Sequence, residues 1–184
     1  GGPVAVPSQD MVLGIYYLTQ ERPGVKGEGM IFRNVNEAIL AYENQEATLH
    51  SRVKVRVSKT MPDGTVKTGI IESTIGRFIF NEIIPQDLGF VDRSIPGNEL
   101  KLEVDFHVAK KQLKQILEKV INVHGATQTA VTLDDIKAIG YKYSTKAAMT
   151  VSISDMTVPA SKPRLIEEAQ ATVDRIAKNY RRGL

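Results

Sequence analysis

The chain has 184 residues, of which 42% are hydrophobic and 24% are charged, and its formal net charge is +3. This balance is typical of a globular protein and excludes a largely disordered chain. Because the sequence has no cysteine, disulfides and thiolate metal sites are excluded, and the cytoplasm is the default compartment. No apolar run approaches the roughly 20 residues of a membrane span, and no secretory signal opens the chain, so no membrane partner is expected.

The first predicted element is a helix from Gln9 to Leu18, which follows a proline-bracketed extended segment. Ser8 stands where a side-chain oxygen can cap the free N–H groups of this helix. Its apolar side chains cover most of the circumference, which indicates a buried helix with neighbours on more than one side. These side chains are Met11, Val12, Ile15, Tyr16 and Leu18.

A short helix from Asn36 to Tyr42 and a β-hairpin over residues 52–71 are predicted next. The valines of the first hairpin strand alternate with arginine and lysine, which is the period of a half-buried strand with a charged face in water. Pro62 and Gly64 flank an aspartate in a sequence with strong turn chemistry. The hairpin is therefore expected to turn at residues 62–64, before a second strand from Val66 to Ile71.

A further helix begins after Ser73 or Thr74, either of which can cap it, and ends before Pro85. Residues 89–97 are expected to form a loop. The second half is predicted to hold a helix over residues 108–123, a short helix that Gly140 ends, and extended chain over residues 151–158.

The last predicted element is a helix from Ser161 to about Arg182, with apolar residues spaced as in a helical hairpin or coiled coil. Strands in the first half and helices in the second indicate an α+β fold: short helices with one hairpin, then a mainly helical half ending in a long helix.

No catalytic site emerges from the residues. None of the 14 glycines belongs to a phosphate-binding loop, and the three histidines lack paired ligands at helical spacing. Adjacent carboxylates on a helix do not face one another, so the pairs Asp134–Asp135 and Glu167–Glu168 do not form an acid/base dyad.

Positive charge gathers in three places: the hairpin, the helix with Lys110 to Lys119, and the C-terminus. Each cluster is most simply a solvated face. If the fold joins them, they form one basic surface, and a standalone nucleic-acid-binding or regulatory module remains the alternative function. A structural adaptor that pairs through its last helix is a third possibility.

Five sequence blocks, in order, resemble the β′ subunit of bacterial RNA polymerase, and they extend over nearly the whole chain. The blocks are residues 6–19 (VPSQDMVLGIYYLT), 26–30 (KGEGM), 49–56 (LHSRVKVR), 74–85 (TIGRFIFNEIIP), and 140–146 (GYKYSTK) with 151–159 (VSISDMTVP). The resemblance predicts that the chain is a fragment of that subunit.

The resemblance divides the chain into an α+β part of the pore domain (residues 1–104), a helical part of that domain (105–159) and a truncated first rim or funnel helix (160–184). In that family this region lines the secondary channel, through which nucleoside triphosphates enter and backtracked RNA 3′ ends leave. The aspartates that bind magnesium in that family lie in an earlier block. The fragment is therefore expected to hold no cofactor and to be inactive alone, with Mg²⁺ present in the full enzyme.

The partners implied by the resemblance are the other β′ segments, the alpha, beta, omega and sigma subunits, DNA template, RNA, nucleoside triphosphates and transcript-cleavage or other secondary-channel factors. The residues placed near the pore or nucleotide are Pro7, Ser8, Gln9, Asp10, Arg77, Lys146 and Asp155. Asp10 is also expected to stabilise its own helix end. The residues placed on the factor-docking face of the rim helix are Arg164, Glu168 and Arg175.

The chain departs from the family pattern at two places. Ala148 stands where the family commonly has glycine, and Ser154 precedes Asp155 where it commonly has two acidic residues. A close backbone approach at Ala148 and a double negative charge at Asp155 are therefore not implied for this chain.

Overall fold

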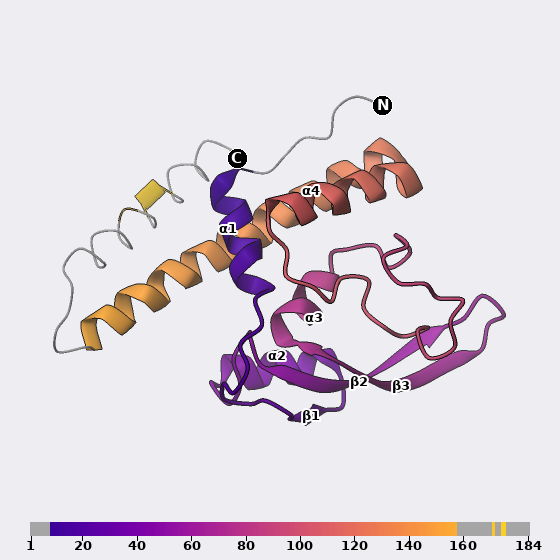
Figure 1. Cartoon of the computed structure of the whole chain (residues 1–184), viewed down its shortest axis with the longest axis horizontal. Coiled ribbons are helices and arrows are strands. Elements are labelled where there is room, and N and C mark those ends of the chain that lie inside the picture. Colours follow the sequence, from indigo (N-terminus) through magenta and orange to yellow (C-terminus); the bar gives the residue numbers. More distant parts are fainter. Residues whose placement is uncertain (1–7, 158–170, 172–173, 176–184) are drawn as a thin grey trace.

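The structure is a computed structural model that describes residues 8–157, 171, 174 and 175, with side chains for residues 8–153, 171, 174 and 175. Its elements in chain order are α1 (Gln9–Leu18), β1 (Ile31–Phe32), α2 (Val35–Glu43), β2 (Arg52–Thr60), β3 (Val66–Thr74), α3 (Ile75–Asn81) and α4 (Lys110–Thr157). Figure 1 shows the strands along one edge of the molecule, α3 above them, and α1 crossing the long helix α4. The α+β class predicted from the sequence is confirmed.

The three strands form one sheet in the order β1-β2-β3, with β1 parallel to β2 and β3 antiparallel to it. The predicted hairpin is confirmed. Its turn is closed by Asp63, whose carboxylate accepts a hydrogen bond of 2.9 Å from the N–H of Thr65. Val53 and Val55 are fully buried, while Lys54 between them and Arg56 after them are exposed, as the alternation predicted.

The predicted helices of the first half are also confirmed, and α1 has the predicted bounds. Asn34 caps α2 by accepting a 2.8 Å hydrogen bond from the N–H of Glu37. Thr74 caps α3 through a 3.2 Å hydrogen bond from the N–H of Arg77. Because α3 begins directly after β3, its cap couples the hairpin to the helix that packs against α1 and α2.

The predicted helix over residues 108–123 is confirmed by the first part of α4, which runs from Lys110 to a change of direction at Gly125 (φ 84°, ψ −178°). The rest differs from the prediction, because α4 continues to Thr157. Gly140 does not end a helix, and residues 151–157 are helical and not extended. Just before these residues, the hydroxyl of Thr150 donates a 2.8 Å hydrogen bond to the carbonyl of Lys146, one turn earlier in α4. The predicted helix at Ser161 to Arg182 lies outside the described residues except at positions 171, 174 and 175.

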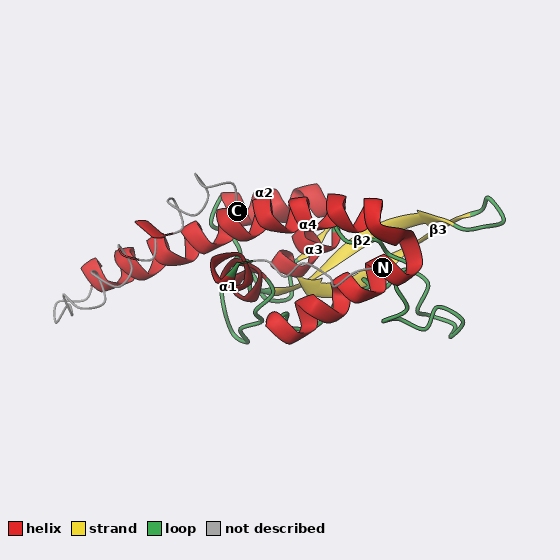
Figure 2. Cartoon of the chain, turned by 90° about the horizontal axis from the view of Figure 1, so that it is seen from above, coloured by secondary structure: helices red, strands yellow, loops and turns green. Residues whose placement is uncertain are grey.

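The core lies where α1, α2, α3, the sheet and both parts of α4 meet. Figure 2 shows the two parts of α4 on either side of its bend, with the sheet beneath. The largest fully buried side chains are Met11, Ile15, Leu18, Leu49, Ile75, Phe78, Phe80, Leu113, Ile116, Leu117 and Ile136. Among the described residues, no helix is long and apolar enough to cross a membrane.

Candidate functional site

The N-terminal turn of α1 carries three of the predicted site residues. Ser8 is at the N-cap position, where its carbonyl accepts a 3.0 Å hydrogen bond from the N–H of Val12, but its hydroxyl makes no capping hydrogen bond. Gln9 is exposed, whereas Asp10 is only 2% exposed. Gln9 is therefore the predicted residue of this turn that is placed to meet a molecule in solvent, and Pro7 lies outside the described residues.

Two glycines allow α1 to pass directly against α4. A Cβ atom on Gly14 would lie 1.9 Å from the carbonyl oxygen of Gly140, and one on Gly140 would lie 2.8 Å from the carbonyl oxygen of Met11. One turn beyond Gly140, the buried hydroxyl of Ser144 donates to the carbonyl of Asp10. The backbone of α4 thus holds the middle and the first turn of α1, and no larger side chain fits between them.

The other end of α1 is held by three side chains from distant parts of the chain. Arg77 Nε donates to the carbonyl of Thr19 at 2.9 Å, and His50 Nδ1 donates to that of Gln20 at 2.8 Å. His107 Nε2 donates to the carbonyl of Tyr16 at 2.9 Å. These donors satisfy carbonyls at and just after the last turn, where positive charge is electrostatically favourable. The orientation of α1 is therefore set at both ends.

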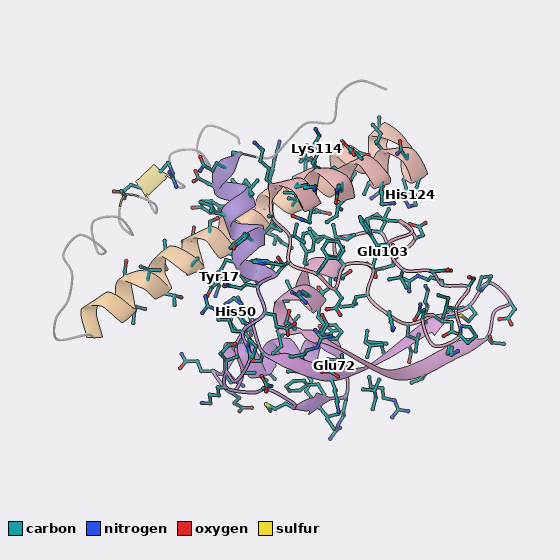
Figure 3. All side chains as sticks on the ribbon, viewed as in Figure 1. Tyr17, His50, Glu72, Glu103, Lys114 and His124 are labelled. Carbon is teal, nitrogen blue, oxygen red and sulfur yellow. The ribbon has the colours of Figure 1, made fainter. Side chains whose placement is uncertain are left out.

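Burial lowers the pKa of His50 below its ordinary value, and the nearby charge of Arg22 acts in the same direction. Figure 3 shows His50 beside Tyr17, whose ring meets the imidazole edge-on at a centroid distance of 4.8 Å. The neutral imidazole is thus favoured where it donates to the end of α1.

A cluster of alternating charges surrounds Arg77 and joins four segments of the chain. Arg77 Nη1 lies 3.3 Å from Glu21 and 3.2 Å from Asp105, and Arg52 Nη1 and Nη2 lie 2.9 Å and 3.2 Å from the same two residues. Ser73 donates a 2.6 Å hydrogen bond to Asp105. Because Arg77 is only 6% exposed, this cluster fixes the loop after α1 to the hairpin and to the segment before α4.

Of the remaining predicted site residues, Lys146 and Arg175 have described side chains. Lys146 is half-buried, with its Nζ 5.6 Å from the centre of the Tyr42 ring. Arg175 is half-exposed, and its Nη2 lies 2.9 Å from Oδ1 of Asp10. The side chains of Asp155, Arg164 and Glu168 lie outside the described ones.

The residues that hold α1 were largely missed by sequence reasoning. Asp105 and His107 precede α4 in a segment without helix or strand, where no periodicity marks a residue as a contact. Gly14 carried a usable signal, since a glycine inside an apolar helix often marks a close approach of another backbone. The contacts that hold α1 join residues up to 134 positions apart.

The described residues include no group of three or more histidines, aspartates or glutamates that could hold a metal ion. Of the three predicted basic clusters, the C-terminal one lies outside the described residues, and the other two are partly engaged by neighbouring side chains. Arg52 pairs with carboxylates, Lys67 Nζ lies 2.9 Å from Glu99, and Lys119 lies over the ring of Phe90 at 5.0 Å.

Comparison with known proteins identifies the class of the chain: it belongs to the family "RNA polymerase Rpb1, domain 3", which matches residues 1–156. It is 68% identical, over all 184 of its residues, to the DNA-directed RNA polymerase subunit beta′ of Lachnoclostridium phytofermentans. It is 56% identical over 184 residues to that subunit of Acetivibrio thermocellus, and 58% identical over 183 residues to that of Clostridium acetobutylicum. The chain spans only 15–16% of the length of these relatives. The family predicted from the five sequence blocks is confirmed.

Proposed function

We propose that this chain acts as the pore portion of the β′ subunit of a DNA-directed RNA polymerase and lines the channel through which nucleoside triphosphates enter and backtracked RNA leaves. The observation that carries this proposal is the identity of 68% to a named β′ subunit over every residue of the chain. A match without gaps in coverage makes it reasonable that the segment performs the same task in this protein as in its relatives.

The geometry of α1 supports a positioning role. The helix is held by α4 at Gly14 and by Arg77, His50 and His107 at its end, and it presents Gln9 to solvent. A side chain on a helix that is fixed at both ends keeps its direction, which is what orientation of a substrate requires. In this proposal Gln9 meets the incoming nucleotide or the RNA 3′ end, and the residues behind it act as supports.

Magnesium does not fit the described residues, because no group of three carboxylates or histidines converges. The sequence also contains no run of aspartates like the one that binds magnesium in this family. No chemical step is therefore assigned to this chain, and the metal ligands of the proposed enzyme lie in other segments of the subunit.

The proposed partners follow from the same assignment. They are the remaining β′ segments, the alpha, beta, omega and sigma subunits, DNA, RNA and nucleoside triphosphates. Transcript-cleavage and other secondary-channel factors would dock on the face that carries Arg164, Glu168 and Arg175. Arg175 supports a link between that face and the pore, since its guanidinium pairs with Asp10 in the first turn of α1.

The test uses polymerase reconstituted with full-length β′ subunit carrying Gln9→Ala. We expect slower elongation, and the matched control Gln115→Ala, an exposed glutamine on α4, should elongate normally. A second variant, Arg164→Ala with Glu168→Ala, should lose factor-stimulated transcript cleavage and keep basal elongation. If both variants behave like the wild type, these residues act only as scaffold and the channel-lining proposal is wrong.

A further inference from the structure

The outward face of the sheet exposes three aliphatic side chains. Ile31 is 64% exposed, Val66 is 66% exposed and Ile70 is 58% exposed, one from β1 and two from β3. The opposite face is the core side, where Val53 and Val55 are fully buried. Aliphatic side chains gathered on one face of a sheet indicate a contact surface more strongly than single exposed residues do.

Two cations lie among these aliphatic residues. Lys54 of β2 is opposite Ile31 on one side and Glu72 on the other, and Arg56 is opposite Ile70. Because alternate residues of a strand point to the same side, Lys54 and Arg56 share the outward face with their exposed neighbours. Both are exposed, in contrast to the valines between and beside them.

The charges of this face are unbalanced. Arg52, the next residue on the same side of β2, is paired with Glu21, Glu72 and Asp105. Glu72 is thereby engaged, with its carboxylate 3.2 Å from Arg52 Nε. Within the described part of the chain, no ion pair of 4 Å or less involves Lys54 or Arg56. The face therefore offers two cations without a carboxylate partner, set between aliphatic groups.

We propose that this face is a docking surface for a protein segment that carries both carboxylates and aliphatic side chains, in a neighbouring part of the assembled polymerase. The proposal rests on the proposed function for the identity of the assembly. Charge complementarity selects an acidic partner, and the aliphatic residues select a protein over RNA, because single-stranded nucleic acid gains most from aromatic side chains on which bases stack. The outward face has no aromatic side chain in β2 or β3.

The experiment places the photo-crosslinking residue benzoyl-phenylalanine at position 70 of this chain, within full-length β′, in purified reconstituted polymerase. The same residue at position 40 is the control, since Leu40 is exposed to a similar extent (54%) but lies on α2. Irradiation at position 70 should give a protein crosslink, and mass spectrometry should map it to a segment with carboxylates and aliphatic residues.

Charge reversal then tests the electrostatic part. Lys54→Glu with Arg56→Glu should lower the crosslink yield about tenfold or more, because two attractive contacts become repulsive. Reversal of Lys110 and Lys114, exposed lysines on α4, should leave the yield unchanged. Assembly of each variant is verified by size-exclusion chromatography, so that loss of folding is not mistaken for loss of docking.

Four results would overturn the docking proposal: no protein crosslink at position 70, a crosslink to nucleic acid, a partner segment without carboxylates, or a yield that charge reversal leaves unchanged. Any of these in a polymerase whose elongation depends on Gln9 would refute the docking surface alone. Normal elongation in the Gln9 variant would instead count against the proposed function, whatever crosslink is found.

Discussion

Gly14 of α1 and Gly140 of α4 bring two helix backbones together so closely that a Cβ atom on Gly14 would lie 1.9 Å from the carbonyl oxygen of Gly140. The same Cβ would lie 2.7 Å from the hydroxyl of Ser144. Two helices can cross at this distance only if both contact positions are glycine. The crossing joins α1 to the second half of α4.

The first prediction concerns this crossing. Gly14→Ala should lower the free energy of unfolding by about 2 kcal/mol, because the clash with backbone atoms outweighs a gain in helix propensity of about 1 kcal/mol. Denaturant unfolding of the 184-residue chain measures the change. Thr127→Ala, at an exposed position of α4, is the control and should not destabilise. A Gly14→Ala chain as stable as the wild type would show that the helices can separate without cost.

The second prediction concerns Arg77. Arg77→Met should cost about 3 kcal/mol, because the buried carbonyl of Thr19 loses its donor and two carboxylates lose a partner. Arg56→Met, at an exposed position of β2, should change stability little. Thermal and denaturant unfolding of the three chains measure the difference. Equal stability of the two variants would contradict the structural role of the buried guanidinium.

The third prediction concerns the segment between α3 and α4, which has neither helix nor strand. The Glu103 carboxylate is fully buried, lies 2.8 Å from Arg93 Nη2 and accepts the N–H of Phe90. Glu103→Gln should therefore destabilise the chain by about 2 kcal/mol, whereas Glu118→Gln at an exposed site should be neutral. Hydrogen exchange should locate the faster amides in residues 86–103. Unchanged exchange there would mean that the pair does not order this segment.

The fourth prediction concerns pH. Because burial lowers the pKa of His50 in the folded state, the unfolded state takes up a proton first, and stability is lost as pH falls from about 6.5 through the folded-state pKa. His50→Asn keeps a donor for the Gln20 carbonyl but does not titrate. Its unfolding free energy should fall less between pH 7.5 and 5 than that of the wild type, in measurements at about half-unit intervals. Parallel curves for the two chains would exclude His50 as a source of acid sensitivity.

The local elements were predictable because their signals are short-range. The alternation of Val53 and Val55 with cations, the capping residue Thr74 and the turn at Gly64 each act within a few residues. Gly140 shows where this reasoning failed. A glycine at the end of a short helical pattern resembles a helix C-cap, yet α1 packs there and α4 continues past it.

The candidate site also contains residues that the sequence predicted and residues that it did not. Gln9 at the start of α1 was placed near the pore by the family resemblance and stays a prediction, and the structure shows only that its side chain is exposed. The residues that orient this helix, such as Asp105, His107 and Ser144, had no local signal, because each acts on a carbonyl or charge far away in the sequence.

The sequence by itself determined the family, the α+β class, the hairpin and the first three helices. It could do so because family motifs, helix caps, turns and hydrophobic periodicity each depend on residues that are close together in the sequence. The tertiary structure alone decided that α4 is continuous beyond Gly140, that Arg77 is buried in a charge cluster, and that α1 is held at both ends. Those features depend on the packing and electrostatics of segments up to 134 residues apart, which local pattern does not encode.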